Sequence, residues 1–250
     1  MDFYEFYQKI KVPEAKDKII FAKLDGIYKH MPETKGCIEN INKEEGCKGW
    51  CCSEQSPQLL YSEFLNIYDF ISKKMSNKQF LNIIEKAMNN SIMGNTNKGC
   101  IFFNEETKMC DIHQKRSFNC RIYGITPDEM FNSRYEKIQK QYEEIEGAFF
   151  YKQCNKVFTI NGEEITSYDI NKWWESLVQI ENILGIPENK INDNIQGGSY
   201  RTPHDHLLLY LMPDNVIYAL SGIRLYNHIE ERKKAVEELM NKIRELYYEN

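Results

Sequence analysis

The chain has 250 residues and a formal net charge of -5 at pH 7, with a sequence pI near 5.7. This acidic balance argues against a general nucleic-acid binder and against a protein that binds anionic membranes. No stretch approaches the ~20 apolar residues of a membrane span, and the first residues lack the basic start and apolar run of a signal peptide. We therefore expect a cytoplasmic protein with neither nucleic acid nor membrane as a partner, folded as a single domain over residues 1–250.

Outside the cysteine-containing segments, the spacing of apolar residues predicts a chain that is mostly helical. Proline or a polar cap marks the expected helix starts at Pro13, Ser56-Pro57, Ser76 and Thr126-Pro127, and the last of these helices is expected to reach Glu146. Four further helices are expected near residues 167–184, 203–212, 215–227 and 229–248. Residues 36–56, which are rich in glycine and lysine, are expected to form a loop.

Two short β-hairpins are expected among the helices. The first joins extended pieces at 101–103 and 109–112 through a polar turn, which would place Cys100 and Cys110 near one end. The second covers residues 157–165 and turns at Asn161-Gly162. The fold class is therefore predicted to be mainly α: a helical domain around a cysteine-ligated metal centre, with one or two short β-hairpins.

Eight cysteines carry the strongest chemical signal, and all lie in the region 37–155, ahead of a helical C-terminal part at 156–250. They form two groups: Cys37, Cys47, Cys51 and Cys52, then Cys100, Cys110, Cys120 and Cys154. Disulfides are rare in the cytosol, so thiols grouped in this way usually bind metal there. We predict that the eight cysteines are metal ligands, in preference to four disulfides or eight unrelated buried thiols.

The number and spacing of the thiols leave the kind of centre open. Eight thiolates can form two Cys₄ sites, or four can form one site while the others are structural or redox active. Cys37 and Cys154 are required only if two full sites form. Adjacent side chains normally diverge, so Cys51 and Cys52 are expected to serve two metals, or only one of them to ligate. Thiolate softness selects zinc, iron–sulfur or Cu(I), but it does not choose between zinc and iron–sulfur.

Charged side chains extend the candidate site. Arg116 and Arg121 flank one cysteine of the second group. They are predicted to contact the cofactor, offsetting the negative charge of a thiolate site or lowering a thiol pKa; a surface ion pair is the alternative. His113 is expected to pack or to form a hydrogen bond, with proton handling as the alternative. His204 and His206 lie two apart on a predicted helix, so they are assigned to capping or solvated positions. No catalytic residue is identified.

The segment from Cys100 to Gly124, CIFFNEETKMCDIHQKRSFNCRIYG, resembles the YkgJ-type cysteine-cluster family, whose members are described as zinc- or iron-chelating proteins. The shared landmarks are a cysteine, a short apolar run, an acidic turn, a second cysteine and a Cys-Arg pair. Two positions depart from the family pattern: His113 stands where tyrosine is frequent, and Ser117 stands where proline usually follows arginine.

The resemblance continues upstream of this segment. Cys47, Cys51 and Cys52 match the end of the family's Cys-x-x-Cys-x-x-Cys-Cys cluster with one extra residue. Cys37 is more remote than usual, whereas Cys154 fits a later lone cysteine. The resemblance implies metal binding. The flagellin lysine-N-methylase group has a similar cysteine cluster, but no glycine-rich SAM-binding fingerprint is evident in this chain.

These observations lead to one functional hypothesis, with three competing functions behind it. We expect an iron–sulfur protein, with [4Fe–4S] favoured over zinc because ligands spread widely along the chain suit a cluster buried between helices. Its function would be redox chemistry or cluster-dependent modification of a protein or peptide substrate. The competing functions are a structural zinc protein that binds a partner, a metal carrier or cluster-assembly accessory, and a SAM-dependent protein lysine methyltransferase.

Overall fold

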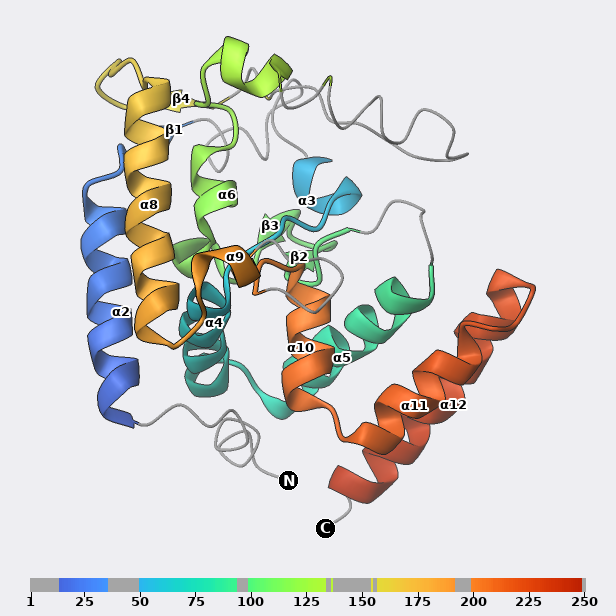
Figure 1. Ribbon diagram of the computed structural model, residues 1–250. Helices are drawn as coiled ribbons and strands as arrows, with labels where there is room; N and C mark the ends of the chain where they lie inside the picture. The colour runs from blue at the N-terminus through green and yellow to red at the C-terminus, as the bar shows by residue number, and fades with distance from the viewer. Residues whose placement is uncertain are drawn as a thin grey trace.

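The computed structural model is mainly helical, as the sequence predicts (Figure 1). It describes residues 14–35, 50–93, 99–133, 136, 154, 157–191 and 199–248. The helices are α2 (Glu14–Lys29), α3 (Trp50–Glu54), α4 (Tyr61–Lys74), α5 (Asn77–Ile92), α6 (Phe118–Ile122), α8 (Ser167–Ile183), α9 (Glu188–Ile191), α10 (Pro203–Leu211), α11 (Asp214–Ile223) and α12 (Ile229–Tyr248), with a 3-10 turn, η1, at His113–Lys115. Residues 128–133 are also helical. The predicted continuation of that helix to Glu146 lies outside the described residues, as does Pro13.

Helix starts follow the predicted caps except where a distant segment intervenes. Ser76 caps α5 as predicted: its hydroxyl accepts from the Gln79 N–H, and the Gln79 side chain accepts from the Ser76 N–H at 2.9 Å. The helix predicted to begin at Ser56-Pro57 begins instead at Tyr61. That prediction is wrong because Leu59 is held extended by two backbone hydrogen bonds with Arg201, at 2.7 and 3.0 Å.

Two short antiparallel strand pairs accompany the helices. β2 (Phe103–Asn104) and β3 (Met109–Cys110) form the first predicted hairpin, with Phe103 opposite Cys110. The second predicted hairpin is wrong: its turn exists, with Gly162 at φ 68°, but β4 (Phe158–Thr159) pairs with β1 (Thr34–Lys35). After the turn, residues 163–165 form no strand, and Thr166 then caps α8.

Two apolar clusters form the core. The first lies between α4, α5, α10, α11 and α12 and includes apolar residues of the β2–β3 hairpin region. The second joins α2, α6, α8 and α9. α4 contributes to the first cluster through Phe64, and Leu60, directly ahead of α4, belongs to the second. The chain around the start of α4 therefore connects the two halves of the core.

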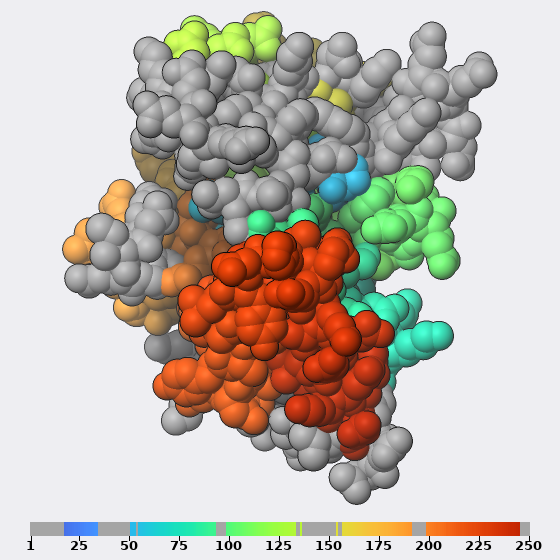
Figure 2. All heavy atoms as spheres, turned by 90° about the vertical axis from the view of Figure 1, so that its right-hand side faces the viewer, coloured from blue at the N-terminus to red at the C-terminus, as the bar shows by residue number. Residues whose placement is uncertain are grey.

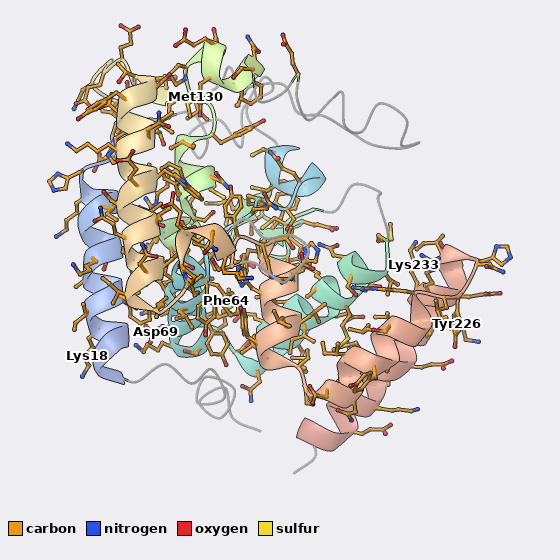
Figure 3. All side chains as sticks on the ribbon, in the orientation of Figure 1. Lys18, Phe64, Asp69, Met130, Tyr226 and Lys233 are labelled. Atoms are coloured by element: carbon orange, nitrogen blue, oxygen red, sulfur yellow. The ribbon has the colours of Figure 1, made fainter. Side chains whose placement is uncertain are left out.

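The outer face of the molecule is formed partly by the C-terminal helices. In Figure 2, α11 and α12 (orange to red) cover the centre of the face turned to the reader, and the β2–β3 region (green) lies beside them. Phe64 lies among the central helices, whereas Tyr226 and Lys233 mark the outer end of the α11–α12 pair (Figure 3). Within the described part of the chain, none of the helices combines the length and apolar character needed to cross a membrane.

Candidate metal centre

The described cysteines of the two groups come mainly from four short segments. Cys51 and Cys52 lie on α3, Cys100 precedes β2, Cys110 ends β3, and Cys120 lies in the middle of α6. Residues 50–54 thus form a short helix where a loop was expected. Cys37 and Cys47 lie outside the described residues.

Backbone contacts hold the two cysteine groups side by side. The Cys100 N–H donates to the Cys52 carbonyl at 2.7 Å. A Cβ atom at Gly99 would lie 2.5 Å from the carbonyl oxygen of Ser53, so only glycine allows this approach of the two backbones. The Gly99 carbonyl also accepts from the Asn90 side chain at 2.7 Å, which fixes the junction to α5.

The β2–β3 hairpin brings the next two cysteines to one end, as the sequence predicts. Phe103 pairs with Cys110 across the hairpin, and the Phe103 N–H donates to the Cys100 carbonyl at 3.0 Å. The Lys86 ammonium on α5 donates to the Phe103 carbonyl at 2.6 Å. Phe102 and Phe103 are buried, so the hairpin presents an apolar face to the first cluster and carries its cysteines with it.

A buried carboxylate places the helix that carries Cys120. Glu63 is 2% exposed and accepts from the Phe118 N–H at 2.6 Å, the Leu60 N–H at 2.8 Å and the Tyr28 hydroxyl at 2.5 Å. It therefore joins α2, the start of α4 and the start of α6. This role was not predicted from the sequence, where the only available signal was an acidic residue near the start of a helix.

The five thiols of α3, the hairpin and α6 are close enough to affect each other's ionisation. Burial raises the pKa of Cys100 well above its usual value, and the Cys110 and Cys120 thiols raise it further. Burial, followed by Cys120, raises the pKa of Cys110 to about 12. For Cys52, the hydrogen bond with Cys51 lowers the pKa, but burial and the neighbouring thiols leave it raised. A bound cation would reverse this preference for the protonated thiols.

The side chains of the adjacent cysteines on α3, Cys51 and Cys52, do not diverge as expected. The Sγ atoms of Cys51 and Cys52 are 3.9 Å apart, so the side chains converge rather than diverge. In a tetrahedral site with metal–sulfur bonds of about 2.3 Å, neighbouring sulfurs lie about 3.8 Å apart. The pair therefore has the spacing of two ligands on one ion. No group of three His, Cys, Asp or Glu side chains in the described ranges has the spacing of an assembled metal site.

Arg116 and Arg121 lie beside the thiols, and the Glu63 carboxylate is close enough to Arg121 to act on its ionisation. Arg116 contacts His113 Nε2 at 2.8 Å and donates to the Thr34 hydroxyl at 3.1 Å. Arg121 donates to the backbone carbonyls of Arg116 and Gln114, both at 3.0 Å. Because Arg116 lowers the pKa of nearby thiols, these positive charges favour thiolate.

The remaining candidates occupy different positions. Burial, followed by the two arginines, lowers the pKa of His113 to about 4, so it is neutral at pH 7 and its Nε2 accepts the Arg116 hydrogen bond. Cys154 lies beside the end of α6: a Cβ atom added at Gly124 would lie 3.4 Å from the Cβ atom of Cys154. His204 and His206 are 3% and 0% exposed and Thr202 caps their helix, so the capping or solvated assignment was wrong.

Comparison with protein families bears on the cysteines directly. Residues 43–146 match the family model CxxCxxCC, described as "Putative zinc- or iron-chelating domain". This stretch is therefore similar to a cysteine-cluster domain. It contains six of the eight cysteines, and Cys37 and Cys154 lie outside it. The predicted family resemblance is confirmed, and with it an assignment to metal chelation. No curated protein and no solved structure gives a match to the chain.

Proposed function

We propose that this chain binds a [4Fe–4S] cluster through cysteine thiolates and uses it in redox chemistry or in the cluster-dependent modification of a protein or peptide. The observation that carries the proposal is the gathering of five thiols from α3, the hairpin and α6 in one buried region of a metal-chelating domain. Cys47 completes the set within the same domain. The candidates for the cluster ligands are these six thiols, and Cys37 and Cys154 would be needed only for a second centre.

The chemistry of the donors fits an iron–sulfur cluster. All of the gathered donors are sulfur, which binds iron–sulfur clusters and zinc in preference to hard cations. Phe102, Phe103 and Phe118 are at most 5% exposed beside three of the cysteines, and an apolar shell of this kind restricts water and tunes the potential of a cluster. Arg116 and Arg121 supply positive charge against the negative charge that four thiolates bring.

A single tetrahedral zinc ion is the second candidate, and one specific observation favours it. The 3.9 Å separation of the Cys51 and Cys52 sulfurs suits two ligands of one ion. A cluster of four irons is larger than one ion, and its ligands bind different corners. If both cysteines of the pair ligate one metal, zinc is the better candidate and the function becomes that of a structural site on a partner-binding protein.

A metal carrier and a methyltransferase are less well supported. A carrier needs accessible, labile ligation, whereas each of the six described cysteines is buried or half-buried. A methyltransferase needs a SAM-binding site, and the sequence contains no glycine-rich fingerprint for one. We therefore place the carrier and the methyltransferase behind the two metal-centre proposals.

Anaerobic purification of the full chain tests the proposal. We expect a brown protein whose visible absorption bleaches with dithionite and returns on reoxidation, with iron and sulfide in equal amounts. A colourless protein that contains zinc would overturn the cluster and support the second candidate. A brown protein whose absorption does not respond to reductant would retain the cluster but contradict its redox role.

A further inference from the structure

The outward side of α11 carries the two most exposed large apolar side chains in the part of the chain that the structure describes. Tyr218 is 77% exposed, and Leu225, which follows the helix, is 82% exposed. Arg224 keeps helical backbone angles, at φ -58° and ψ -22°, so the helical turn continues to Leu225. Residues seven apart are separated by about two helical turns and lie on the same side of a helix. Tyr218 and Leu225 therefore form one apolar stripe.

The other side of α11 is already packed. Val216, Leu220 and Ile223 are buried in the first apolar cluster, and Figure 2 shows α11 and α12 at the surface of the molecule. A surface helix that buries one side in the core normally presents polar residues on the opposite side. Single exposed apolar residues are common on proteins, but two large ones on one stripe of a short helix depart from this pattern.

Two small exposed residues, Ser221 and Gly222, separate Tyr218 from Leu225. The Ser221 hydroxyl donates to the Ile217 carbonyl at 3.0 Å, so its hydrogen bond is made within the helix. A Cβ atom added at Gly222 would meet nothing within 4 Å, and the φ of Gly222 is not positive. Glycine is among the least favourable residues inside a helix, and no contact or backbone angle of the described residues requires it here. Close approach of a second backbone would account for it.

The stripe is symmetric about its centre. Tyr218 and Leu225 are equally far along the sequence from the midpoint between Ser221 and Gly222. If two copies of α11 cross antiparallel at this midpoint, Tyr218 of each copy meets Leu225 of the other, and the two small residues allow the helices to approach closely. A two-fold interface requires a surface that complements itself in this way, because residue i contacts residue j while residue j contacts residue i.

The charges at the two ends of the stripe follow the same symmetry. Asp214 is the first residue of α11 and Arg224 directly follows its last residue, and both are exposed. The Arg224 Nε donates to the Ser91 carbonyl at 2.9 Å, which holds the guanidinium at this end of the helix. Neither Asp214 nor Arg224 forms a salt bridge within the described ranges. In an antiparallel pair the acidic end of each helix lies beside the basic end of the other, which favours this orientation over a parallel one.

We propose that this stripe binds a second copy of the chain, giving a two-fold dimer in which α11 packs antiparallel on α11. The contact residues are Asp214, Tyr218, Ser221, Gly222, Arg224 and Leu225. α11 has ten residues and is therefore about 15 Å long, so the contact is smaller than a standard interface of about 800 Å² per partner. The dimer therefore dissociates on dilution. No cysteine lies on the stripe, so metal content does not depend on dimerisation.

Analytical ultracentrifugation of the full chain over a range of concentrations is the direct test. We expect the mass to rise from 29.7 kDa toward twice that value as the concentration increases. Tyr218→Ser should raise the Kd of the dimer by at least about tenfold, because aromatic anchors dominate interfaces. Tyr168→Ser is the matched control, since Tyr168 on α8 is 72% exposed, and should leave Kd unchanged. A monomeric mass at every concentration, or equal effects of the two substitutions, would overturn the proposal.

Two helix glycines give an independent test. An added Cβ atom would meet nothing within 4 Å at Gly222 or at Gly26 on α2. At a concentration where the protein is monomeric, Gly222→Ala and Gly26→Ala should each raise Tm, by up to about 2–4 °C, because alanine favours the helix. Only Gly222→Ala should weaken the dimer, by about tenfold or more, since its methyl group separates the two backbones. An unchanged Kd in Gly222→Ala would show that the α11 backbones are not in contact and would contradict the proposed packing.

Discussion

The long helices of the first apolar cluster and the cysteine region (50–54 and 99–122) are held in place by different interactions. α5 and α12 have 16 and 20 residues and bury apolar faces against the same cluster. The elements of the cysteine region have two to five residues, too few to form stably alone. They depend on hydrogen bonds to other segments, such as those from Cys100 to Cys52 and from Phe118 to Glu63.

This difference means that helical content and metal binding should respond to different substitutions. Burial of apolar surface stabilises by roughly 0.8 kcal/mol for each CH₂ group, wherever along a helix it occurs. A metal centre needs several ligands at defined positions, so the loss of one has a large local effect. The cysteine region also lies where the two apolar clusters meet, with Cys100 in the first and Phe118 and Ile122, on either side of Cys120, in the second.

The largest expected effect is the loss of metal on replacing a cysteine of the second group. Cys110→Ser and Cys120→Ser should each abolish stoichiometric metal binding, because serine is a poor ligand for soft metals. Far-UV circular dichroism should stay close to that of the parent chain, since the long helices are packed by apolar residues. Metal analysis and circular dichroism on the same samples check both statements. Met88→Leu, a volume-conserving change in the first cluster, is the control and should keep its metal; full metal content in either serine variant would refute its ligand role.

The pH dependence of stability should have opposite signs with and without metal. In the metal-free protein burial raises the pKa of Cys110 from 9.0 to about 12. The unfolded chain then loses protons above pH 9 while the folded chain keeps them. Stability should fall as pH rises through this window, by about 1.4 kcal/mol per pH unit for each such thiol. With metal bound, the folded thiols are thiolates, so stability should fall on acidification instead.

Urea denaturation between about pH 6 and pH 10.5, a range that spans the ionisation of an unfolded thiol, measures both profiles. The metal-free and metal-loaded proteins are compared at the same protein concentration and ionic strength. Parallel profiles in the two forms would show that the described thiols are not the groups that change ionisation on metal binding.

The regular helices could be predicted from the sequence because their signals are local. Ser76 caps α5, and the C-terminal helices lie close to the predicted ranges, since apolar spacing and capping residues are read within one segment. The start of α4 and the partner of β4 could not be predicted in this way. Each depends on a distant segment, Arg201 in one case and β1 in the other.

The candidate cysteines could be picked out from the sequence, whereas the residues that hold them in place could not. Grouped cysteines indicate metal directly, and the family match agrees with that inference. Glu63 gave no such signal, because a single glutamate at a helix start usually faces solvent. Its importance comes from three donors supplied by α2, the start of α4 and α6, which only the fold brings together. The convergence of Cys51 and Cys52 likewise depends on the side-chain conformations within α3.

Removing the charge of Glu63 should weaken the connection between the cysteine region and the long helices. Glu63→Gln replaces one acceptor oxygen by an amide that faces an N–H donor, and should cost about 2–3 kcal/mol of unfolding free energy. It should also lower metal affinity, because α6 loses its anchor. Glu85→Gln is the matched control: Glu85 forms a partly exposed ion pair with Arg244 at 2.7 Å, a type of contact that typically contributes less than about 1 kcal/mol. If the two substitutions lower the unfolding free energy and the metal affinity equally, Glu63 does not anchor α6.

The smallest expected effect comes from comparing two glycines with nearly the same positive φ, one beside the cysteine region and one beside a long helix. Gly124 follows α6 at φ 89°, and Gly185 follows α8 at φ 85°. An alanine at either position is strained by about 1–2 kcal/mol. At Gly185 the new Cβ would meet nothing within 4 Å, whereas at Gly124 it would lie 2.8 Å from the Val157 Cβ and 3.2 Å from the Cys154 carbonyl oxygen.

Gly124→Ala should therefore destabilise the protein by about 1 kcal/mol more than Gly185→Ala, because side-chain overlap adds to the same backbone strain. Thermal unfolding of the two variants measures the difference. The overlap would displace the segment that carries Cys154, so the metal content of Gly124→Ala tests whether this cysteine belongs to the metal centre. A lower metal content in Gly124→Ala, with that of Gly185→Ala unchanged, would indicate that Cys154 is part of the centre. If both variants lose the same stability and keep all of their metal, the chain near Cys154 can move aside without affecting the site.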